Sequence, residues 1–453
     1  MTASTTPERL SDAAVRPLRT LDPDAPLDDL QWLDDVIGDA RVIAIGESAH
    51  YNRESYQLRH RLLRYLVERH GFDAYAFESG FTEGWSVDNW VRGGGNPIGQ
   101  VMANDITSLM GLWKPMRAQL EWMAGHNRAS TRAIGFYGID LSGSNASLLP
   151  GLDAVLGYLA QAEPEFRVDP DIRETAAAFS ASSAFSIPAA FASYGKLAPA
   201  ARDSLTASLA DLTAGIPSRR LDYLRRTTEE TYERACHSLS LTVTIDAMFR
   251  ALARGDRHGM MMLRDTAIAG TVEWILRRTD RIVLAAHNAH VQRWPGTLPG
   301  MLPVTTMGVR LADRLGSDYR VVGMTTTSGR TLNPSADFFA GQLFTDMEAP
   351  EPGSLDALMA ASHDGLFATD LRRLSPSDAA IVGSVTRQRY GTYYSDLSPL
   401  DAYDAIVHIP HVTAADPDVD ALTHAPREVR DVFSRWKLFA EVCALPGPED
   451  TAA

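Results

Sequence analysis

Four short apolar runs share one design, in which the run ends in or beside an acid or a histidine. They are RVIAIGE at 41–47, AYAFES at 74–79, AIGFYGID at 133–140 and RIVLAAHNAH at 281–290. Continuous apolar runs, rather than strict alternation with polar residues, are typical of strands buried on both faces of a sheet. YRVVGMTTT at 319–327 has the same character. The pattern predicts an α/β fold with a mostly parallel central sheet flanked by helices.

A helix is predicted between the first two runs. Asn52 is expected to cap its N-terminus, and Gly71 is expected to terminate it. Between them the apolar residues recur at helical spacing, as in Tyr56, Leu58, Leu62, Leu63, Leu66 and Val67. Strand, helix and strand then form a parallel crossover, and such sheets bind ligands beyond the carboxyl ends of their strands.

The middle of the chain has a different character. From about residue 148 to residue 278 it is rich in Ala and Ser and has helical patterning, with breaks such as AEPEFRVDPD and AGIPSRR. We expect a helical lobe over the carboxyl ends of the strands. The predicted division is a mobile N-terminal segment at 1–28, an α/β catalytic core at 29–147 and 279–453, and a helical lobe at 148–278.

Composition limits the partners and the compartment. The 453 residues carry a net charge of −14, so phosphate backbones and anionic membranes would repel the chain. The two cysteines, Cys236 and Cys443, fit neither a disulfide framework nor a thiolate metal site. No apolar run approaches the length of about eighteen residues that spans a membrane. We therefore expect a cytoplasmic protein with no nucleic-acid or membrane partner.

The candidate chemistry lies where the apolar runs end. Glu47 and His50 follow the first run, and Glu78 ends the second. Burying a carboxylate costs several kcal/mol unless it is paired, so a His or Arg partner is expected. Asp140 ends the third run, and the fourth supplies two candidates at a spacing of three, His287 and His290.

Carboxylates beside an imidazole can fix its tautomer and raise its basicity, which suits a general base acting on water. Hydrolysis of an ester follows from such a site, with a second His or an Arg stabilising the oxyanion. Two alternatives remain open. Ser48 lies at the nucleophile position of a G-x-S-x-G turn, although His50 stands where that turn needs Gly. The same acids and imidazoles could also bind the metal of a metal-dependent hydrolase.

Longer blocks of the sequence resemble the erythromycin esterase family. The stretch IGESAHYNRESYQLRHRLLRYLVERHGFDAYAFESGF contains a G-E-x-x-H turn, a long helix ending in HGF and a strand ending in Glu. GFYGIDL, LRDTAIAGTVEWIL, AAHNAHV and MGVRLADRLGSDYRVVGMTT are similar to later blocks of that family, in the same order. The recognisable blocks run from about Val42 to Thr326.

The resemblance implies hydrolysis of a macrolide lactone by activated water, with no covalent acyl-enzyme, metal or cofactor. His50 matches the general base, and Glu47 and Glu78 match essential carboxylates. His287 and His290 match a second histidine pair. Arg264, in the RD block, is expected to contact the oxyanion or the substrate.

The remaining assignments concern the substrate, expected to be a macrolide or another polyketide ester. The substrate-binding set is predicted to comprise His290, Phe81, Trp85 and Asp140. The RD block departs from the family pattern, because Ile268-Ala269-Gly270-Thr271 replaces Met-Ala-x-Asn. Two other functions therefore stay open: a biosynthetic acyl transferase, cyclase or eliminating enzyme that uses the same site, or a non-catalytic ligand binder.

Overall fold

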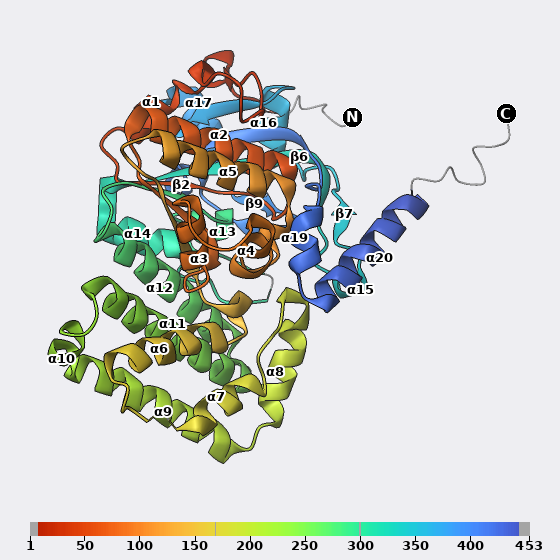
Figure 1. The fold of residues 1–453 in the computed structure, drawn as a ribbon. Coiled ribbons are helices and arrows are strands. Elements are labelled where there is room, and N and C mark those ends of the chain that lie inside the picture. The colour runs from red at the N-terminus through yellow and green to blue at the C-terminus, as the bar shows by residue number, and fades with distance from the viewer. Residues whose placement is uncertain (1–7, 168, 299, 444–453) are drawn as a thin grey trace.

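The computed structural model describes residues 8–167, 169–298 and 300–443. Its centre is a nine-stranded sheet in the order β1-β8-β11-β6-β2-β5-β3-β4, with β7 paired to β6 (Figure 1). The strands are β1 (Arg16–Pro17), β2 (Val42–Ile45), β3 (Ala74–Gly80), β4 (Gly135–Asp140), β5 (Ile282–Ala285), β6 (Tyr319–Leu332), β7 (Phe344–Asp346), β8 (Phe367–Asp370) and β11 (Ala405–Val412). β9 (Arg387–Tyr390) and β10 (Tyr393–Asp396) form a separate hairpin.

The predicted α/β fold with a mostly parallel sheet is confirmed. β11, β6, β2, β5, β3 and β4 run parallel, and β1, β7 and β8 pair antiparallel with their neighbours. All five expected runs form strands of this sheet. Because β5 lies between β2 and β3, the residues that follow these three strands are neighbours at one edge.

The two faces of the sheet explain the unbroken apolar runs. In β2, Val42 and Ala44 belong to one buried cluster, whereas Ile43 and Ile45 belong to the cluster on the opposite face. The helices that contribute to the second cluster include α1 (Leu33–Ile37), α2 (Arg53–His70), α3 (Gly84–Val91), α4 (Ile98–Asp105), α5 (Lys114–Ala129), α19 (Val419–His424) and α20 (Arg427–Cys443). Those that contribute to the first include α12 (Arg257–Leu276), α14 (Met307–Leu315), α16 (Leu355–Ser362) and α17 (Pro376–Gly383). Central strands such as β2 and β5 are therefore covered on both sides.

Helices α6 to α12 follow one another between β4 and β5 and form the helical lobe below the sheet in Figure 1. They are α6 (Leu149–Ala162), α7 (Pro170–Ala177), α8 (Ile187–Lys196), α9 (Pro199–Ser218), α10 (Arg220–Leu224), α11 (Glu229–Ala253) and α12. Lobe residues such as Leu152 and Phe249 share one buried cluster with Val42 and Leu284 of the sheet. The lobe therefore packs on the sheet through a continuous core.

Two expectations at the ends of elements need correction. Asn52 precedes α2, but its side chain makes no capping bond and instead donates to the Arg330 carbonyl at 2.7 Å. The N-terminal segment expected to be mobile is packed from residue 8 onward. Leu10 is fully buried, and Arg16 and Pro17 pair with β8. Residues 1–7 of that segment lie outside the described residues.

The chain after residue 338 completes the sheet. It supplies β7, β8 and β11 to the sheet and the hairpin of β9 and β10. Of the short helices, α13 (Asn288–Val291) follows β5, α15 (Asp337–Ala340) lies between β6 and β7, and α18 (Pro399–Ala402) lies between β10 and β11.

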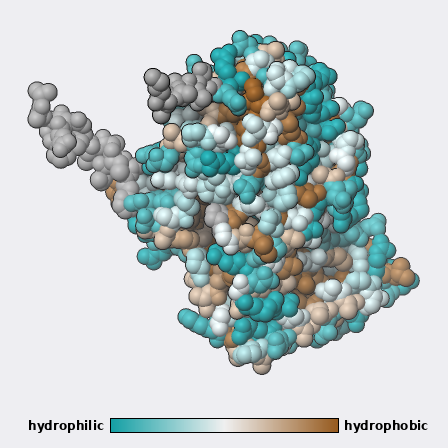
Figure 2. Space-filling model, turned by 180° about the vertical axis from the view of Figure 1, so that it is seen from behind, coloured by the Kyte–Doolittle hydropathy of each residue, from teal (hydrophilic) through white to brown (hydrophobic). Residues whose placement is uncertain are grey.

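The surface turned away in Figure 1 is mostly hydrophilic, with apolar residues in small groups (Figure 2). Across the described ranges, no helix combines the length and apolar character needed to cross a membrane.

Candidate active site

The turn after β2 is held against the loop after β5. Gly46 has no room for a side chain, because a Cβ there would collide with the side chain of Asn288. Asn288 donates its backbone N–H to the Glu47 carbonyl at 2.8 Å and its side-chain amide to the Met324 carbonyl at 2.8 Å. This close approach explains why the first apolar run stops at a glycine.

Glu47 is buried between two basic side chains. Its Oε1 lies 2.7 Å from Nδ1 of His50, and its Oε2 pairs with the buried guanidinium of Arg59 on α2. Burial alone would raise the pKa of Glu47, but the charge of Arg59 and the His50 ring outweigh it and hold this pKa below its usual value. Glu47 is therefore an anion whose oxygen fixes the proton of His50 on Nδ1.

Glu78, at the end of β3, is the second buried carboxylate. Its Oε2 accepts the backbone N–H of His287 at 2.7 Å, and its Oε1 accepts from Arg264 at 3.1 Å. Burial opposes its ionisation, but His290, His50 and Arg264 outweigh burial and place the pKa of Glu78 well below the usual value. The basic partner expected from the sequence is present as Arg264, with His290 Nε2 3.5 Å from the carboxylate.

The ring of His287 is held by backbone groups on both sides. Nδ1 accepts the Ala289 N–H at 3.1 Å, and Nε2 lies 3.1 Å from the Ser48 carbonyl, to which it donates. Burial and the nearby His50 lower the pKa of His287 to about 3. His287 is therefore neutral, and its ring packs edge-on against His50 with centroids 5.2 Å apart.

His290 has the opposite character. Nδ1 lies 2.9 Å from the buried carboxylate of Asp265, which also accepts the Met307 N–H at 2.8 Å. Burial would lower the pKa of His290, but Asp265 and Glu78 outweigh burial and Arg264, so this pKa is raised. Arg264 Nη1 lies 3.2 Å from Nε2 of His290 and can donate to that nitrogen only while it carries no proton. Protonation of His290 at Nε2 therefore weakens this contact.

Arg264 joins the lobe to the sheet. From α12 it binds Asp140 with Nη2 at 2.6 Å and Nε at 3.1 Å, and it also binds Glu78. The carboxylates of Asp140 and Glu78 raise the pKa of Arg264 against the effect of burial. The guanidinium is thus permanently charged and fixed in orientation.

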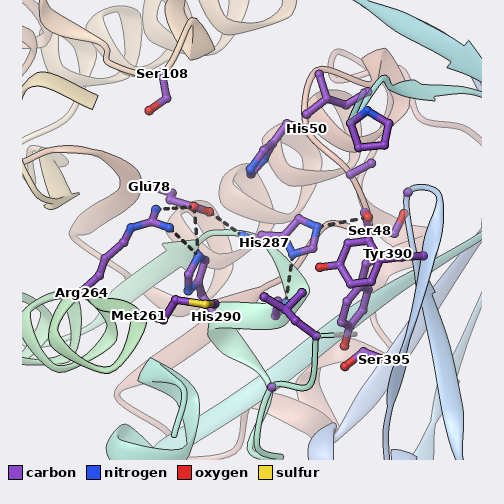
Figure 3. Close-up of a pocket in the computed structure, with 18 of the residues that line it drawn as sticks. Ser48, His50, Glu78, Ser108, Met261, Arg264, His287, His290, Tyr390 and Ser395 are labelled. Carbon is purple, nitrogen blue, oxygen red and sulfur yellow. Dashed lines mark hydrogen bonds and ion pairs between the residues drawn. The ribbon is translucent and has the colours of Figure 1, made fainter. Parts of the chain in front are cut away.

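These groups border a cavity of about 490 Å³. Figure 3 shows Glu78, Arg264, His287 and His290 converging beneath His50, with Ser108 on one side and Tyr390 on the other. His50, Glu78, Arg264, His287 and His290 all line the cavity, together with apolar residues such as Ile187, Met261, Leu298 and Phe338. An acid and imidazole cluster thus faces a largely apolar chamber.

The structure brings together most of the site predicted from sequence but not its aromatic members. Phe81 is 1% exposed and packs edge-on against Trp85 and Trp274. Neither Phe81 nor Trp85 lines the cavity, which corrects their assignment to the substrate pocket. Asp140 is also absent from the cavity wall; it is buried and contacts Arg264, so it supports the site from behind.

Several site residues were missed from the sequence. Arg59 is one of several arginines on α2, and no sequence pattern marks it as the partner of the buried Glu47. Asn288 lies inside the HNAH motif, but its backbone contacts depend on the neighbouring strands. Tyr390 enters from the hairpin of β9 and β10 and packs against His287 with ring centroids 5.3 Å apart. Asp265 could have been identified from the sequence only through the RD block, in which it follows Arg264.

No metal ligand set is evident in the part of the chain that the structure describes: no three or more His, Cys, Asp or Glu side chains there are grouped to hold an ion. The site residues instead pair with one another as acids and bases.

Comparison with known proteins identifies the family of this chain. Residues 67–412 match the sequence model of the erythromycin esterase family. Erythromycin esterase type II of Escherichia coli is 29% identical over 406 residues, which cover 87% of this chain and 94% of that protein. Erythromycin esterase type I of the same organism is 26% identical over 419 residues, with 89% and 98% covered.

A solved structure agrees with this placement. A mutant of erythromycin esterase EreC in its open conformation has a TM-score of 0.72 and 21% identity to this chain, over 89% of this chain and 98% of that one. The fold and the family match define a hydrolase of ester bonds built on a mostly parallel α/β sheet. The chain belongs to the erythromycin esterase family, as its sequence blocks indicated.

Proposed function

We propose that this protein opens the lactone ring of an erythromycin-like macrolide with a water molecule activated by His50. The observation that carries the proposal is the 2.7 Å bond between Glu47 Oε1 and His50 Nδ1. A carboxylate at Nδ1 keeps the proton there and leaves the lone pair on Nε2. Because His50 lines the cavity, that lone pair is available to a water molecule beside a bound ester.

His290 is proposed to supply the proton for the departing alkoxide. Its raised pKa favours a protonated ring, and Asp265 binds Nδ1, which leaves Nε2, beside Arg264 and Glu78, as the nitrogen that would release the proton. His287 has the opposite pKa shift, and both of its nitrogens are engaged. Neighbouring titratable groups with opposite shifts are a common basis for dividing acid and base roles. His287 is therefore proposed to position the His50 ring and not to transfer a proton.

Arg264 and Glu78 are proposed to balance charge around the reacting ester. Arg264 lines the cavity and is positively charged, so negative charge that develops on the carbonyl oxygen would be stabilised nearby. Glu78 and Asp140 fix its guanidinium in place. Such preorganised charge requires little rearrangement during the reaction.

Direct attack by water is favoured over an acyl-enzyme at Ser48. Among the described contacts, no hydrogen bond joins the Ser48 hydroxyl to an imidazole, and the Ser48 carbonyl is occupied by His287. Hydrolysis is also favoured over acyl transfer, cyclisation or elimination, because the two Escherichia coli relatives are named esterases.

The test is to incubate the purified protein with erythromycin and follow the mass of the compound, with and without prior chelation of metals. We expect a product heavier by one water in both cases. Intact protein quenched during turnover should show no covalent adduct. An unchanged antibiotic would overturn the substrate assignment, an adduct would overturn direct water attack, and loss of turnover on chelation would favour a metal-dependent hydrolase.

A further inference from the structure

A second cavity of about 200 Å³ adjoins the catalytic one. Ser108, Ser144 and Ala184 line both cavities. Contributions to the smaller cavity come from the start of α3, the end of α4, the turn after β4, the lobe and the start of α20. A molecule that fills the catalytic cavity therefore has a neighbouring space into which a substituent can extend.

The smaller cavity is polar, whereas the catalytic chamber is largely apolar. Its wall carries hydroxyls from Ser and Thr side chains together with the carboxyl group of Glu83. Glu83 Oε1 accepts the Gly143 N–H at 2.7 Å. Glu83 Oε2 is buried and has no hydrogen-bond partner among the described residues. The cavity wall thus includes a carboxyl group with one buried, unpaired oxygen, beside several hydroxyls.

A second acid, Asp105, interacts with Glu83 but is not part of the cavity wall. Asp105, at the end of α4, interacts electrostatically with Glu83, and burial together with Glu83 raises the pKa of Asp105 to about 6. Burial also raises the pKa of Glu83, against the Gly143 N–H and the Ser142 hydroxyl. No cationic side chain of the described residues acts on the pKa of either acid, so Glu83, which lines the cavity, has no protein cation beside it.

The wall between the two cavities contains residues with left-handed backbone conformation. Ser108 and Ser144 both have positive φ, at 56° and 53°. Ser108 donates its N–H to Ser144 Oγ at 2.9 Å and accepts from the Tyr51 hydroxyl at 2.6 Å. Tyr51, next to the general base, also has a positive φ of 66°. The wall is therefore bonded to the catalytic turn, and backbone strain of this kind is commonly found at functional sites.

We propose that the smaller cavity is a subsite for a basic, hydroxyl-bearing substituent of the lactone substrate, with Glu83 as the acceptor for its ammonium group. The inference rests on the proposed function, because the ester must occupy the adjoining cavity. It predicts a preference for lactones whose ring carries a protonated amine. Neutral lactones would bind in the catalytic chamber alone.

The probes are erythromycin, whose dimethylamino group is protonated at neutral pH, and erythromycin N-oxide, in which that nitrogen is no longer basic. Glu83→Gln keeps an oxygen for the Gly143 N–H and removes the charge. It should raise KM for erythromycin about tenfold, with kcat and the KM of the N-oxide nearly unchanged. Glu121→Gln, an exposed glutamate on α5, is the matched control and should alter neither compound.

Asn104→Lys provides a second variant on an exposed residue that lines the same cavity. Its ammonium should weaken erythromycin binding and leave the N-oxide unaffected, so a misfolded Glu83→Gln protein would not end the test. Equal KM values for both compounds in wild type, Glu83→Gln and Asn104→Lys would overturn the subsite.

Calorimetric binding to His50→Ala separates this inference from the proposed function. If wild type does not hydrolyse erythromycin, the proposed function fails. The subsite then stands only if erythromycin binds more tightly than the N-oxide and Glu83→Gln in the same background removes that difference.

Discussion

Glu47 and His50 lie three residues apart in one turn and are joined by a 2.7 Å bond between Oε1 and Nδ1. The turn can form only because Gly46 lets Asn288 approach the backbone. Arg59 contacts the other oxygen of Glu47 from α2, so the carboxylate bridges a permanent cation and the His50 imidazole. The local sequence thus places His50 beside Glu47, and the packing of α2 brings Arg59 against Glu47 and keeps that carboxylate ionised.

Replacing Glu47 by Gln should reduce kcat for lactone hydrolysis by about 10²-fold or more, because the imidazole loses the anion that holds its tautomer. KM should change little, since the carboxylate faces His50 and Arg59 and is not part of the cavity wall. Steady-state kinetics with matched thermal unfolding curves measure this split. Glu68→Gln on the outer face of α2 is the control. A rise in KM with unchanged kcat would contradict the assigned role.

Replacing Arg59 by Met should destabilise the fold by about 3–5 kcal/mol, since Glu47 would be left as a buried charge without its main partner. The free energy of unfolding in urea measures the effect. The double variant Arg59→Met with Glu47→Gln should recover part of the loss, because no unpaired charge remains. Equal stability of the single and double variants would show that the pair is not coupled.

The two histidines of the HNAH motif should influence stability in opposite pH windows. The folded-state pKa of His287, about 3, lies below the ordinary value of about 6.5, so the unfolded chain binds more protons between these values. Its contribution to stability is present above pH about 6.5 and is lost as pH falls toward 3. The pKa of His290 is raised, so its contribution is present below pH about 6.5 and is lost as pH rises through the folded-state value.

The measurement is the free energy of unfolding against pH for wild type, His287→Gln and His290→Gln. His287→Gln should flatten the rise in stability below about pH 6.5, and His290→Gln should flatten the decline above it. Parallel curves for the two variants would contradict the opposite charge states.

Ser48→Ala should retain most of the turnover, whereas loss of a true nucleophile costs on the order of 10⁶-fold in kcat. The contact that matters at this position is the backbone carbonyl that accepts His287 Nε2, which alanine preserves. Initial rates under saturating substrate measure the effect. A large loss of kcat in a correctly folded variant would instead support Ser48 as the nucleophile.

The sequence predicted the strands and the acids at their ends because a strand buried on both faces leaves an unbroken apolar run. Glu47, Glu78 and His287 follow such runs directly. Phe81 and Trp85 were misassigned because closeness to Glu78 along the chain does not say on which side of the sheet a ring emerges. In the structure both rings join the aromatic cluster with Trp274.

Other features depend on contacts that no local pattern encodes. The N-terminal segment looked mobile, yet Arg16 and Pro17 pair with a strand some 350 residues later in the chain. Tyr390 is placed by a hairpin within the Asp- and Pro-rich tail, where short strands give little periodic signal. Arg59 is distinguished only by its pairing with the buried Glu47, which the sequence does not reveal.

The most direct test of water activation by the imidazole of residue 50 is the rate of lactone opening by His50→Gln under saturating erythromycin, with folding verified. Wild type should convert the antibiotic to a product one water heavier, and the variant should be slower by about 10²-fold or more. A variant that opens the lactone as fast as wild type would contradict the central claim.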